Sequence, residues 1–180
     1  MPVERIFVTG GSGSGKSTLA RRIGELTGLP VHDLDVVARE GGGRGVQTSD
    51  ALRTEQVSQI LESGRWVVEG VHLGWTQPLL EAADVVVWLD HLSGKQSGGR
   101  VLRRFATGAL AEARMRHGRE RFLRFGDYVR RLRELFVSLP DTRSFPEQDL
   151  VKQLDGISAN IVRCRSQADI ERFLKTLQPA

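Results

Sequence analysis

A glycine-rich stretch near the start of the chain constrains the fold more than any other part of the sequence. Residues 10–18 read GGSGSGKST, which fits the pattern G-x-x-x-x-G-K-[ST]. The apolar run Ile6-Phe7-Val8 before it is typical of a buried strand, and the apolar residues after it recur at helical spacing. A strand, a glycine loop and a helix in this order is the context in which the pattern binds nucleotide phosphates.

The residue types of this stretch have physical reasons. Glycines let consecutive backbone N–H groups converge without a Cβ in the way, and the following helix offers its free N-terminal N–H groups. Lys16 reaches the β- and γ-phosphates of a triphosphate, and the Ser17 hydroxyl binds Mg²⁺. The predicted nucleotide-binding residues are Gly11, Ser12, Gly13, Ser14, Gly15, Lys16, Ser17 and Thr18.

Length and composition predict one domain over residues 1–180. Apolar content of 39% and charged content of 27% are typical of a globular protein, and no apolar run reaches the roughly 18 residues that span a bilayer. Cys164 is the sole cysteine, so an intramolecular disulfide or a thiolate metal cluster is excluded. The first residues do not resemble a signal peptide. We therefore expect a cytoplasmic location.

The remaining chain alternates apolar runs with helical patterns. This alternation predicts an α/β fold: a three-layer α/β/α sandwich around a five-stranded parallel sheet in the order 2-3-1-4-5. Right-handed crossovers then place the carboxyl ends of all strands at one edge, where ligands bind in such sheets. The expected strands are 3–9, 31–34, 66–68, 85–89 and 160–162; the expected helices are 16–26, 50–61, 78–82, 100–108, 119–139 and a final one capped by Ser166.

Carboxylates follow two of these strands. Asp33 and Asp35 come at the end of the second strand, and Glu69 at the end of the third. On an extended chain the Asp-x-Asp spacing puts both side chains on the same side. One of the two would hold Mg²⁺ through water while the other meets a substrate hydroxyl. The predicted metal-site residues are Ser17, Asp33 and Glu69.

Two further segments carry glycine or arginine in unusual density. Residues 36–48 include four glycines among residues 41–45, and we expect a flexible loop there. It is either a surface linker or a segment that orders over substrate with Arg39 and Arg44 as anion contacts. Residues 100–133 hold eleven arginines against three acids. Such a block suits nucleic acid or the phosphates of a nucleotide, and the glycine loop favours the second.

The chain resembles the small P-loop kinases of the adenylate-kinase and uridine-kinase-like group. More narrowly, it is similar to bacterial adenylate-kinase-related proteins of the topology-modulation or FlaR-like type. The resemblance rests on the glycine loop and on four short stretches: VHDLD at 31–35, WVVEG at 66–70, VVWLD at 86–90 and RVLRR at 100–104.

This resemblance implies phosphoryl transfer from ATP–Mg²⁺ to a small acceptor. It places Arg100 and Arg104 near the base and phosphates of the nucleotide, as catalytic residues beside Lys16, Asp33 and Asp35. It also implies an arginine-rich helical lid, which residues 105–121 supply with Arg114, Arg116, Arg119 and Arg121.

The sequence departs from adenylate kinases after the third strand. Those enzymes have Asp-Gly-Phe-Pro-Arg there, and this chain has Glu69-Gly70-Val71-His72. The arginine that grips a nucleoside monophosphate is therefore missing at that position. The Asp-x-Asp resembles shikimate-kinase-type enzymes, which implies a hydroxyl acceptor oriented by Asp35, with Asp33 near Mg²⁺. The predicted substrate residues are Asp33, Asp35, Arg39, Glu69 and His72, with Trp75 beyond them.

Three alternatives stay open at the level of sequence. The first is a nucleoside monophosphate kinase. The second is a kinase that acts on nucleic acid or on a modified base within it, because of the basic block at 100–133. The third is a nucleotide-binding regulatory protein with little turnover. The acceptor itself, here a nucleoside, a sugar-like compound or another metabolite, is not identified by the sequence.

Overall fold

The computed structural model describes residues 3–11, 13–39, 46–71, 74–90, 154 and 157–177. The predicted helices 100–108 and 119–139 and the candidate lid at 105–121 lie outside these residues. The strands are β1 (Arg5–Gly10), β2 (Val31–Asp33), β3 (Trp66–Glu69), β4 (Val85–Leu89) and β5 (Asn160–Cys164). The helices are α1 (Lys16–Thr27), α2 (Leu34–Ala38), α3 (Asp50–Glu62), α4 (Gln77–Ala82) and α8 (Gln167–Thr176).

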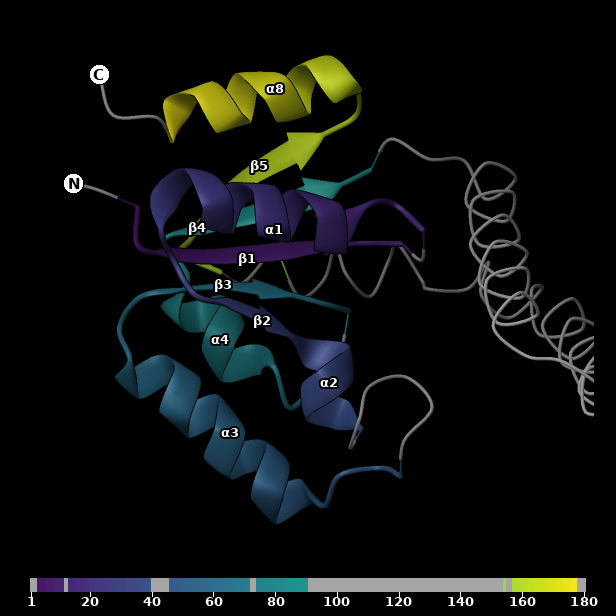
Figure 1. Cartoon of the computed structure of the whole chain (residues 1–180), viewed down its shortest axis with the longest axis vertical. Coiled ribbons are helices and arrows are strands. Elements are labelled where there is room, and N and C mark those ends of the chain that lie inside the picture. The colour runs from purple at the N-terminus through teal and green to yellow at the C-terminus, as the bar shows by residue number, and fades with distance from the viewer. Residues whose placement is uncertain are drawn as a thin grey trace, which may run out of the picture.

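The five strands form one parallel sheet in the order β2-β3-β1-β4-β5, which confirms the predicted topology. Helices α1 and α8 cover one face, and α2, α3 and α4 cover the other (Figure 1). The register pairs Val8 and Asp33 with Glu69, and Gly10 with Leu89. The ends of β1, β2 and β3 therefore lie side by side, and the glycine loop begins there.

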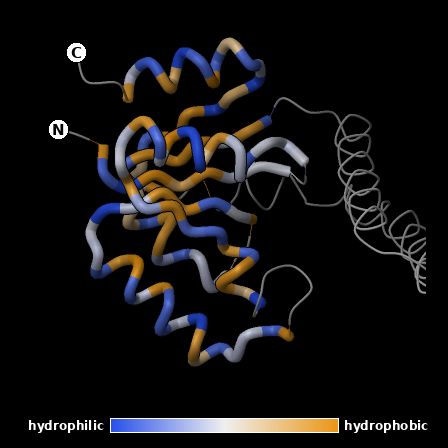
Figure 2. The backbone as a smooth tube through the Cα atoms, in the orientation of Figure 1, coloured by the Kyte–Doolittle hydropathy of each residue, from blue (hydrophilic) through white to orange (hydrophobic). Residues whose placement is uncertain are grey.

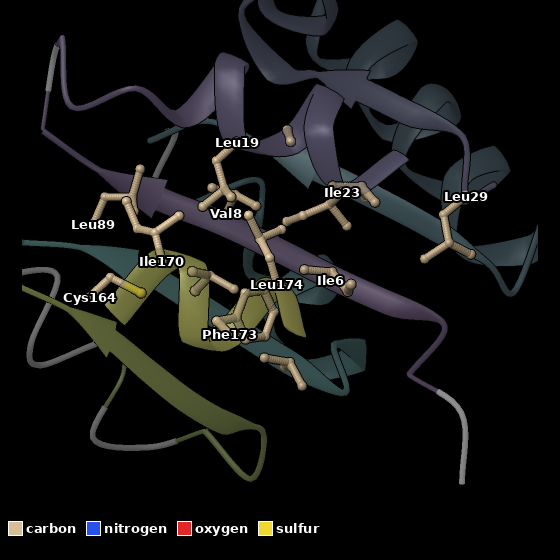
Figure 3. Close-up of a cluster of buried hydrophobic side chains, with 14 residues drawn as sticks. Ile6, Val8, Leu19, Ile23, Leu29, Leu89, Cys164, Ile170, Phe173 and Leu174 are labelled. Atoms are coloured by element: carbon tan, nitrogen blue, oxygen red, sulfur yellow. The ribbon is translucent and has the colours of Figure 1, made fainter. Parts of the chain in front are cut away.

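The central strands β1, β3 and β4 carry continuous apolar runs because both faces of a parallel sheet are covered there. Alternate residues enter different cores: Ile6 and Val8 face α1 and α8, whereas Phe7 faces the layer of α3 and α4. Figure 3 shows the first of these cores. Figure 2 shows the hydrophobic strands at the centre and hydrophilic residues along the outer helices. No described helix is long and apolar enough to cross a membrane.

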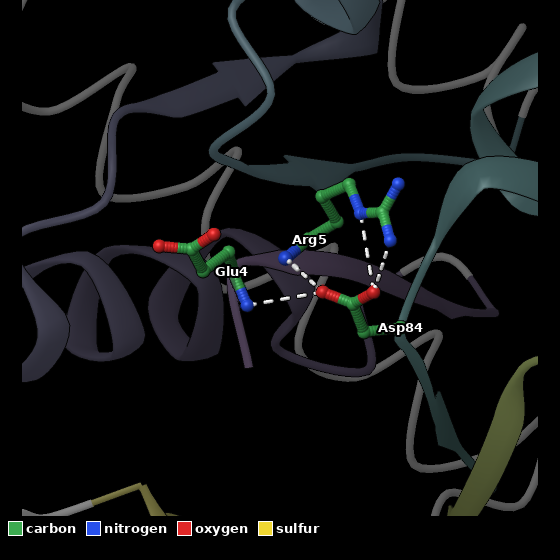
Figure 4. Close-up of polar contacts among 3 residues, drawn as sticks. All are labelled: Glu4, Arg5 and Asp84. Atoms are coloured by element: carbon green, nitrogen blue, oxygen red, sulfur yellow. Dashed lines mark hydrogen bonds and ion pairs between the residues drawn. The ribbon is translucent and has the colours of Figure 1, made fainter. Parts of the chain in front are cut away.

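A polar clamp fixes the opposite edge of the sheet, where β1 and β4 begin (Figure 4). The Asp84 carboxylate accepts hydrogen bonds from the backbone N–H groups of Glu4 and Arg5, at 3.0 and 2.9 Å. It also pairs with the guanidinium of Arg5. The clamp lies where β1 and β4 begin, whereas the glycine loop follows the carboxyl end of β1. We therefore assign the clamp a structural role.

The second strand differs from its prediction. We expected residues 31–34 to be extended, but β2 ends at Asp33 and Leu34 begins the short helix α2. The cause is local: the Asp33 side chain accepts a hydrogen bond from the backbone N–H of Asp35 at 2.8 Å, which is an N-terminal helix cap. The predicted flexible loop 36–48 therefore starts too early, since its residues 36–38 are helical.

Candidate active site

The glycine loop adopts the backbone that its sequence predicts. Gly10, Gly13 and Gly15 have φ angles of 145°, 73° and 100°, in the region that favours glycine. Gly15 is the N-cap of α1 and has no side chain with which to cap the helix, and the first N–H groups of a helix have no intrahelical partner. The Ser14 hydroxyl oxygen is buried and has no hydrogen-bond partner among the residues that the structure describes. The loop therefore offers donors at the positive end of a helix, as a phosphate requires.

Replacing Gly10 by Ala should destabilise the fold, because the new Cβ would lie 2.6 Å from the Leu89 carbonyl oxygen at a φ angle of 145°. Strained backbone of this kind costs about 1–3 kcal/mol. Gly11→Ala is the matched control, since its Cβ would meet nothing within 4 Å, and we expect a change of at most about 0.5 kcal/mol. Urea unfolding of both variants measures the difference. Equal midpoints for Gly10→Ala and wild type would contradict the packing described here.

Lys16, in the first turn of α1, folds back over the loop. Its ammonium group donates hydrogen bonds to the carbonyl oxygens of Gly10 and Gly11, both at 3.0 Å. Burial lowers the pKa of Lys16, and the nearby carboxylates of Glu69, Asp35 and Asp33 oppose that shift. A cation whose described hydrogen bonds go to two carbonyls at the mouth of an anion-binding loop can exchange them for phosphate oxygens.

Glu69 is the buried carboxylate of the site. Glu69 is 5% exposed at the end of β3, and its carboxylate lies near the Ser17 side chain. Burial raises the pKa of Glu69; the Ser17 side chain and Lys16 oppose the shift, while Asp33 and Asp35 add to it. The fold thus buries an ionisable carboxylate next to the hydroxyl predicted to bind Mg²⁺, and this burial disfavours its charged form. Carboxylates with perturbed pKa values are common at functional sites.

Asp33 and Asp35 lie in different secondary structure at the site. Asp33 ends β2 beside Glu69 and caps α2, whereas Asp35 lies in the first turn of α2 and is exposed. The expectation of two carboxylates on the same side of an extended chain was therefore wrong. Both still act electrostatically on Lys16 and Glu69, so the turn into α2 keeps them at the same edge.

The structure thus gathers Lys16, Ser17, Asp33, Asp35 and Glu69 at one edge of the sheet. Arg39 is exposed at the end of α2 and forms an isolated antiparallel bridge with Gln47. Gly11, Gly13 and Thr18 also belong to the loop and the start of α1. Four predicted site residues lie outside the described part of the chain: Ser12, His72, Arg100 and Arg104.

The residues present fit a magnesium ion bound together with phosphates. In the described ranges, no group of three or more His, Cys, Asp or Glu side chains is placed to hold a metal ion. Mg²⁺ at nucleotide sites keeps several waters and takes one or two protein ligands plus phosphate oxygens. The neighbouring side chains of Ser17 and Glu69, next to the N-terminus of α1, supply a hydroxyl and a carboxylate of that kind.

Glu69→Gln should raise the stability of the protein and weaken its binding of nucleotide. Because the pKa of Glu69 is raised in the folded state, that state holds the proton more tightly than the unfolded chain does. The free energy of unfolding of wild type therefore falls as the pH rises from the unfolded-state pKa of this carboxyl to its raised folded-state pKa. We expect the variant to be more stable than wild type at pH 8, with a smaller difference at pH 5. Its Mg²⁺-dependent ATP affinity should fall about 10–100-fold.

Urea unfolding at the two pH values and ATP titration with and without Mg²⁺ measure both effects. Glu62→Gln, which changes an exposed carboxylate at the end of α3, is the control and should alter neither. A Glu69→Gln variant that binds ATP–Mg²⁺ as tightly as wild type would contradict the role given to this carboxylate.

Comparison with known proteins supports the fold. No protein-family model and no curated protein matches the sequence. Among solved structures, a presumed kinase from Chloroflexus aurantiacus j-10-fl is 19% identical, with a TM-score of 0.52 over 98% of this chain and 95% of that one. This likeness, together with the glycine loop and strand order, defines the fold as that of P-loop kinases.

Two other similar structures are named for their substrates. A gluconokinase from Sinorhizobium meliloti 1021 is 20% identical, with a TM-score of 0.48 over 97% of this chain and 95% of that one. A shikimate kinase from Acinetobacter baumannii, solved with shikimate, is 16% identical, with a TM-score of 0.46 over 97% and 90%. With TM-scores below 0.5, neither structure is evidence about the acceptor of this chain.

Proposed function

We propose that this chain is an ATP–Mg²⁺-dependent kinase that transfers the γ-phosphoryl group of ATP to a hydroxyl group of a small acceptor. The observation that carries the proposal is the meeting of one cation, one hydroxyl and three carboxylates at the start of α1: Lys16, Ser17, Asp33, Asp35 and Glu69. A loop that only bound nucleotide would not need Asp33 and Asp35 beside it. Both are contributed by the neighbouring β2–α2 turn.

The proposed roles follow from position and charge. The loop N–H groups and Lys16 would hold the β- and γ-phosphates, and Lys16 would leave the carbonyls of Gly10 and Gly11 to do so. Ser17 would bind Mg²⁺ directly, with Glu69 and Asp33 orienting it and its waters. Bound there, Mg²⁺ supplies charge neutralisation at the β- and γ-phosphate oxygens.

Asp35 is the proposed group that orients and deprotonates the acceptor. It is exposed in the first turn of α2, and one oxygen of the neighbouring Asp33 carboxylate caps that helix. The acceptor oxygen would bond to the γ-phosphorus as the bond from that phosphorus to the bridging oxygen breaks. The electron pair leaves with ADP, and the hydroxyl proton goes to Asp35. Arg100 and Arg104 are proposed to neutralise charge on the phosphates, and Arg39 and His72 to contact the acceptor.

A small hydroxyl compound is favoured over a nucleoside monophosphate by the sequence after β3. No arginine follows Gly70 in the next five residues, where adenylate kinases are expected to have one. ADP formation with a panel of nucleosides, polyols, hydroxy acids and nucleoside monophosphates tests the assignment. Turnover with hydroxyl compounds supports it. Turnover only with monophosphates would instead support a nucleoside monophosphate kinase. ATP binding with no turnover against any class would support a nucleotide-binding regulatory protein.

A further inference from the structure

A close contact joins the end of β3 to the start of α2. Gly70 follows β3 and is buried, and Leu34, the first residue of α2, is 0% exposed. A Cβ on Gly70 would lie 2.7 Å from the Cβ of Leu34 and 2.9 Å from its Cδ1, whereas ordinary contacts of this kind are 3.4–4 Å. The Leu34 side chain therefore fills the space that a side chain at position 70 would need.

The backbone N–H of Gly70 is bonded within the sheet. It donates to the carbonyl oxygen of Val8 at 3.1 Å, which continues the pairing of β3 with β1. The next residue along β2 and β3 after the paired Asp33 and Glu69 is Leu34 on one chain segment and Gly70 on the other. Because its N–H is already used, Gly70 contributes to this edge of the sheet through the absence of a side chain.

Helix α2 depends on such contacts for its position. It has five residues, and a helix of that length is not stable in isolation. Its buried residues are Leu34, Val37 and Ala38, while Asp35 is exposed. At its end, Ala38 accepts a hydrogen bond from the backbone N–H of Thr48 at 3.0 Å. At its start, the packing of Leu34 sets where Asp35, the next residue, lies.

The position of Asp35 matters for the chemistry proposed above. Asp35 acts electrostatically on Lys16 and Glu69, so its carboxylate lies at the same edge of the sheet as the phosphate loop. Figure 1 shows α2 continuing from β2, which is the outer strand of the sheet on this side. A group that takes a proton during phosphoryl transfer must be placed accurately, and a misplacement of about 1 Å can lower the rate about 100-fold.

We propose that Gly70 is a positioning residue for phosphoryl transfer: its missing side chain lets Leu34 pack against the end of β3, and this contact fixes Asp35 relative to the phosphate loop. The inference rests on the proposed function, in which Asp35 takes the proton of the acceptor hydroxyl. A methyl group at position 70 would push Leu34 and the first turn of α2 away by about 1 Å. Lys16 and Ser17, on α1, would stay in place.

Gly70→Ala tests this inference with two measurements on the whole protein. With the acceptor found by the panel, kcat should fall about 10–100-fold while the affinity for ATP and Mg²⁺ is unchanged. Amide hydrogen exchange reports the position of α2 without turnover. The N–H of Asp35, which donates to Asp33 Oδ1 at 2.8 Å, should exchange about tenfold faster than in wild type. The N–H of Leu19 in α1, bonded to Gly15, should exchange as before.

Gly64→Ala is the matched control. Gly64 also has a positive φ angle, 68° against 158° at Gly70, but its Cβ would meet nothing within 4 Å, and it lies before the start of β3. We expect a lower melting temperature from this control, with kcat and the exchange of the Asp35 N–H as in wild type.

Leu34→Ala shrinks the other partner of the contact. It should change kcat and the exchange of the Asp35 N–H in the same direction as Gly70→Ala, and it carries the test if Gly70→Ala does not fold. Both changes act through one contact, so the double variant should lose less kcat than the product of the two single losses.

The outcomes separate the inference from the proposed function. If Gly70→Ala keeps the kcat of wild type, or if the N–H groups of Asp35 and Leu19 exchange faster by the same factor, Gly70 has a purely structural role and the inference is overturned. Single losses that multiply in the double variant would overturn it as well. If wild type phosphorylates no acceptor, the proposed function fails, and the exchange of the Asp35 N–H alone decides whether Gly70 fixes this residue.

Discussion

Lys16→Ala should reduce ATP turnover by at least about 10²–10³-fold, the loss seen when one preorganised transition-state donor is removed. The ammonium group is the cation at the loop, and in the absence of nucleotide it contacts only two loop carbonyls among the hydrogen bonds described. Its removal therefore leaves no apolar cavity and breaks no element of the sheet. The measurement is the rate of ADP formation at saturating ATP, together with the melting temperature.

Lys175→Ala is the matched control for this prediction. Lys175 lies in the last turn of α8 and is exposed, so its removal takes away the same charge and chain length outside the site. We expect wild-type turnover from the control and a folded, inactive protein from Lys16→Ala. If Lys16→Ala turned over ATP at the wild-type rate, the glycine loop would not be the site of catalysis.

Asp35→Asn should lower kcat by about 10²–10⁴-fold with little change in the KM for ATP, because it removes the proposed proton acceptor and leaves the phosphate loop intact. The backbone N–H that bonds to Asp33 is unaffected by the change, so α2 should persist. Steady-state kinetics with the acceptor found by the panel, and circular dichroism for the fold, provide the measurement.

Asp33→Asn distinguishes the two carboxylates. Asparagine also caps helices well, so α2 is kept, while a negative charge beside Glu69 is lost. We expect this variant to need more Mg²⁺ for half-maximal rate and to retain much of its kcat at saturating Mg²⁺. If Asp33→Asn abolished kcat and Asp35→Asn retained it, the two proposed roles would be exchanged.

The strand order and the phosphate loop could be predicted because both depend on local patterns. The motif at residues 10–18 fixes a strand, a turn and a helix, and continuous apolar runs such as 66–68 and 85–89 mark strands buried on both faces. The right-handed rule for crossovers then places the carboxylates at one edge. Asp33, Asp35 and Glu69 were assigned to that edge correctly for this reason.

The helix α2 could not be predicted from periodicity, because five residues carry too little of it. Its start depends on the capping side chain of Asp33 and on Leu34 packing against the bare backbone of Gly70, 36 residues later in the chain. The position of Arg53 against Trp75 has the same origin. In the sequence it is one more arginine on an amphipathic helix, and only the fold brings Trp75 over it.

The most direct test of the central claim follows the γ-phosphoryl group itself. ATP labelled at the γ-phosphorus is incubated with the protein, Mg²⁺ and a mixture of small hydroxyl metabolites, and the label is traced among ATP, inorganic phosphate and new phosphate esters. The account predicts a labelled ester, formed with Mg²⁺ and absent with Lys16→Ala. Label that stays in ATP, or that appears only in inorganic phosphate, would contradict it.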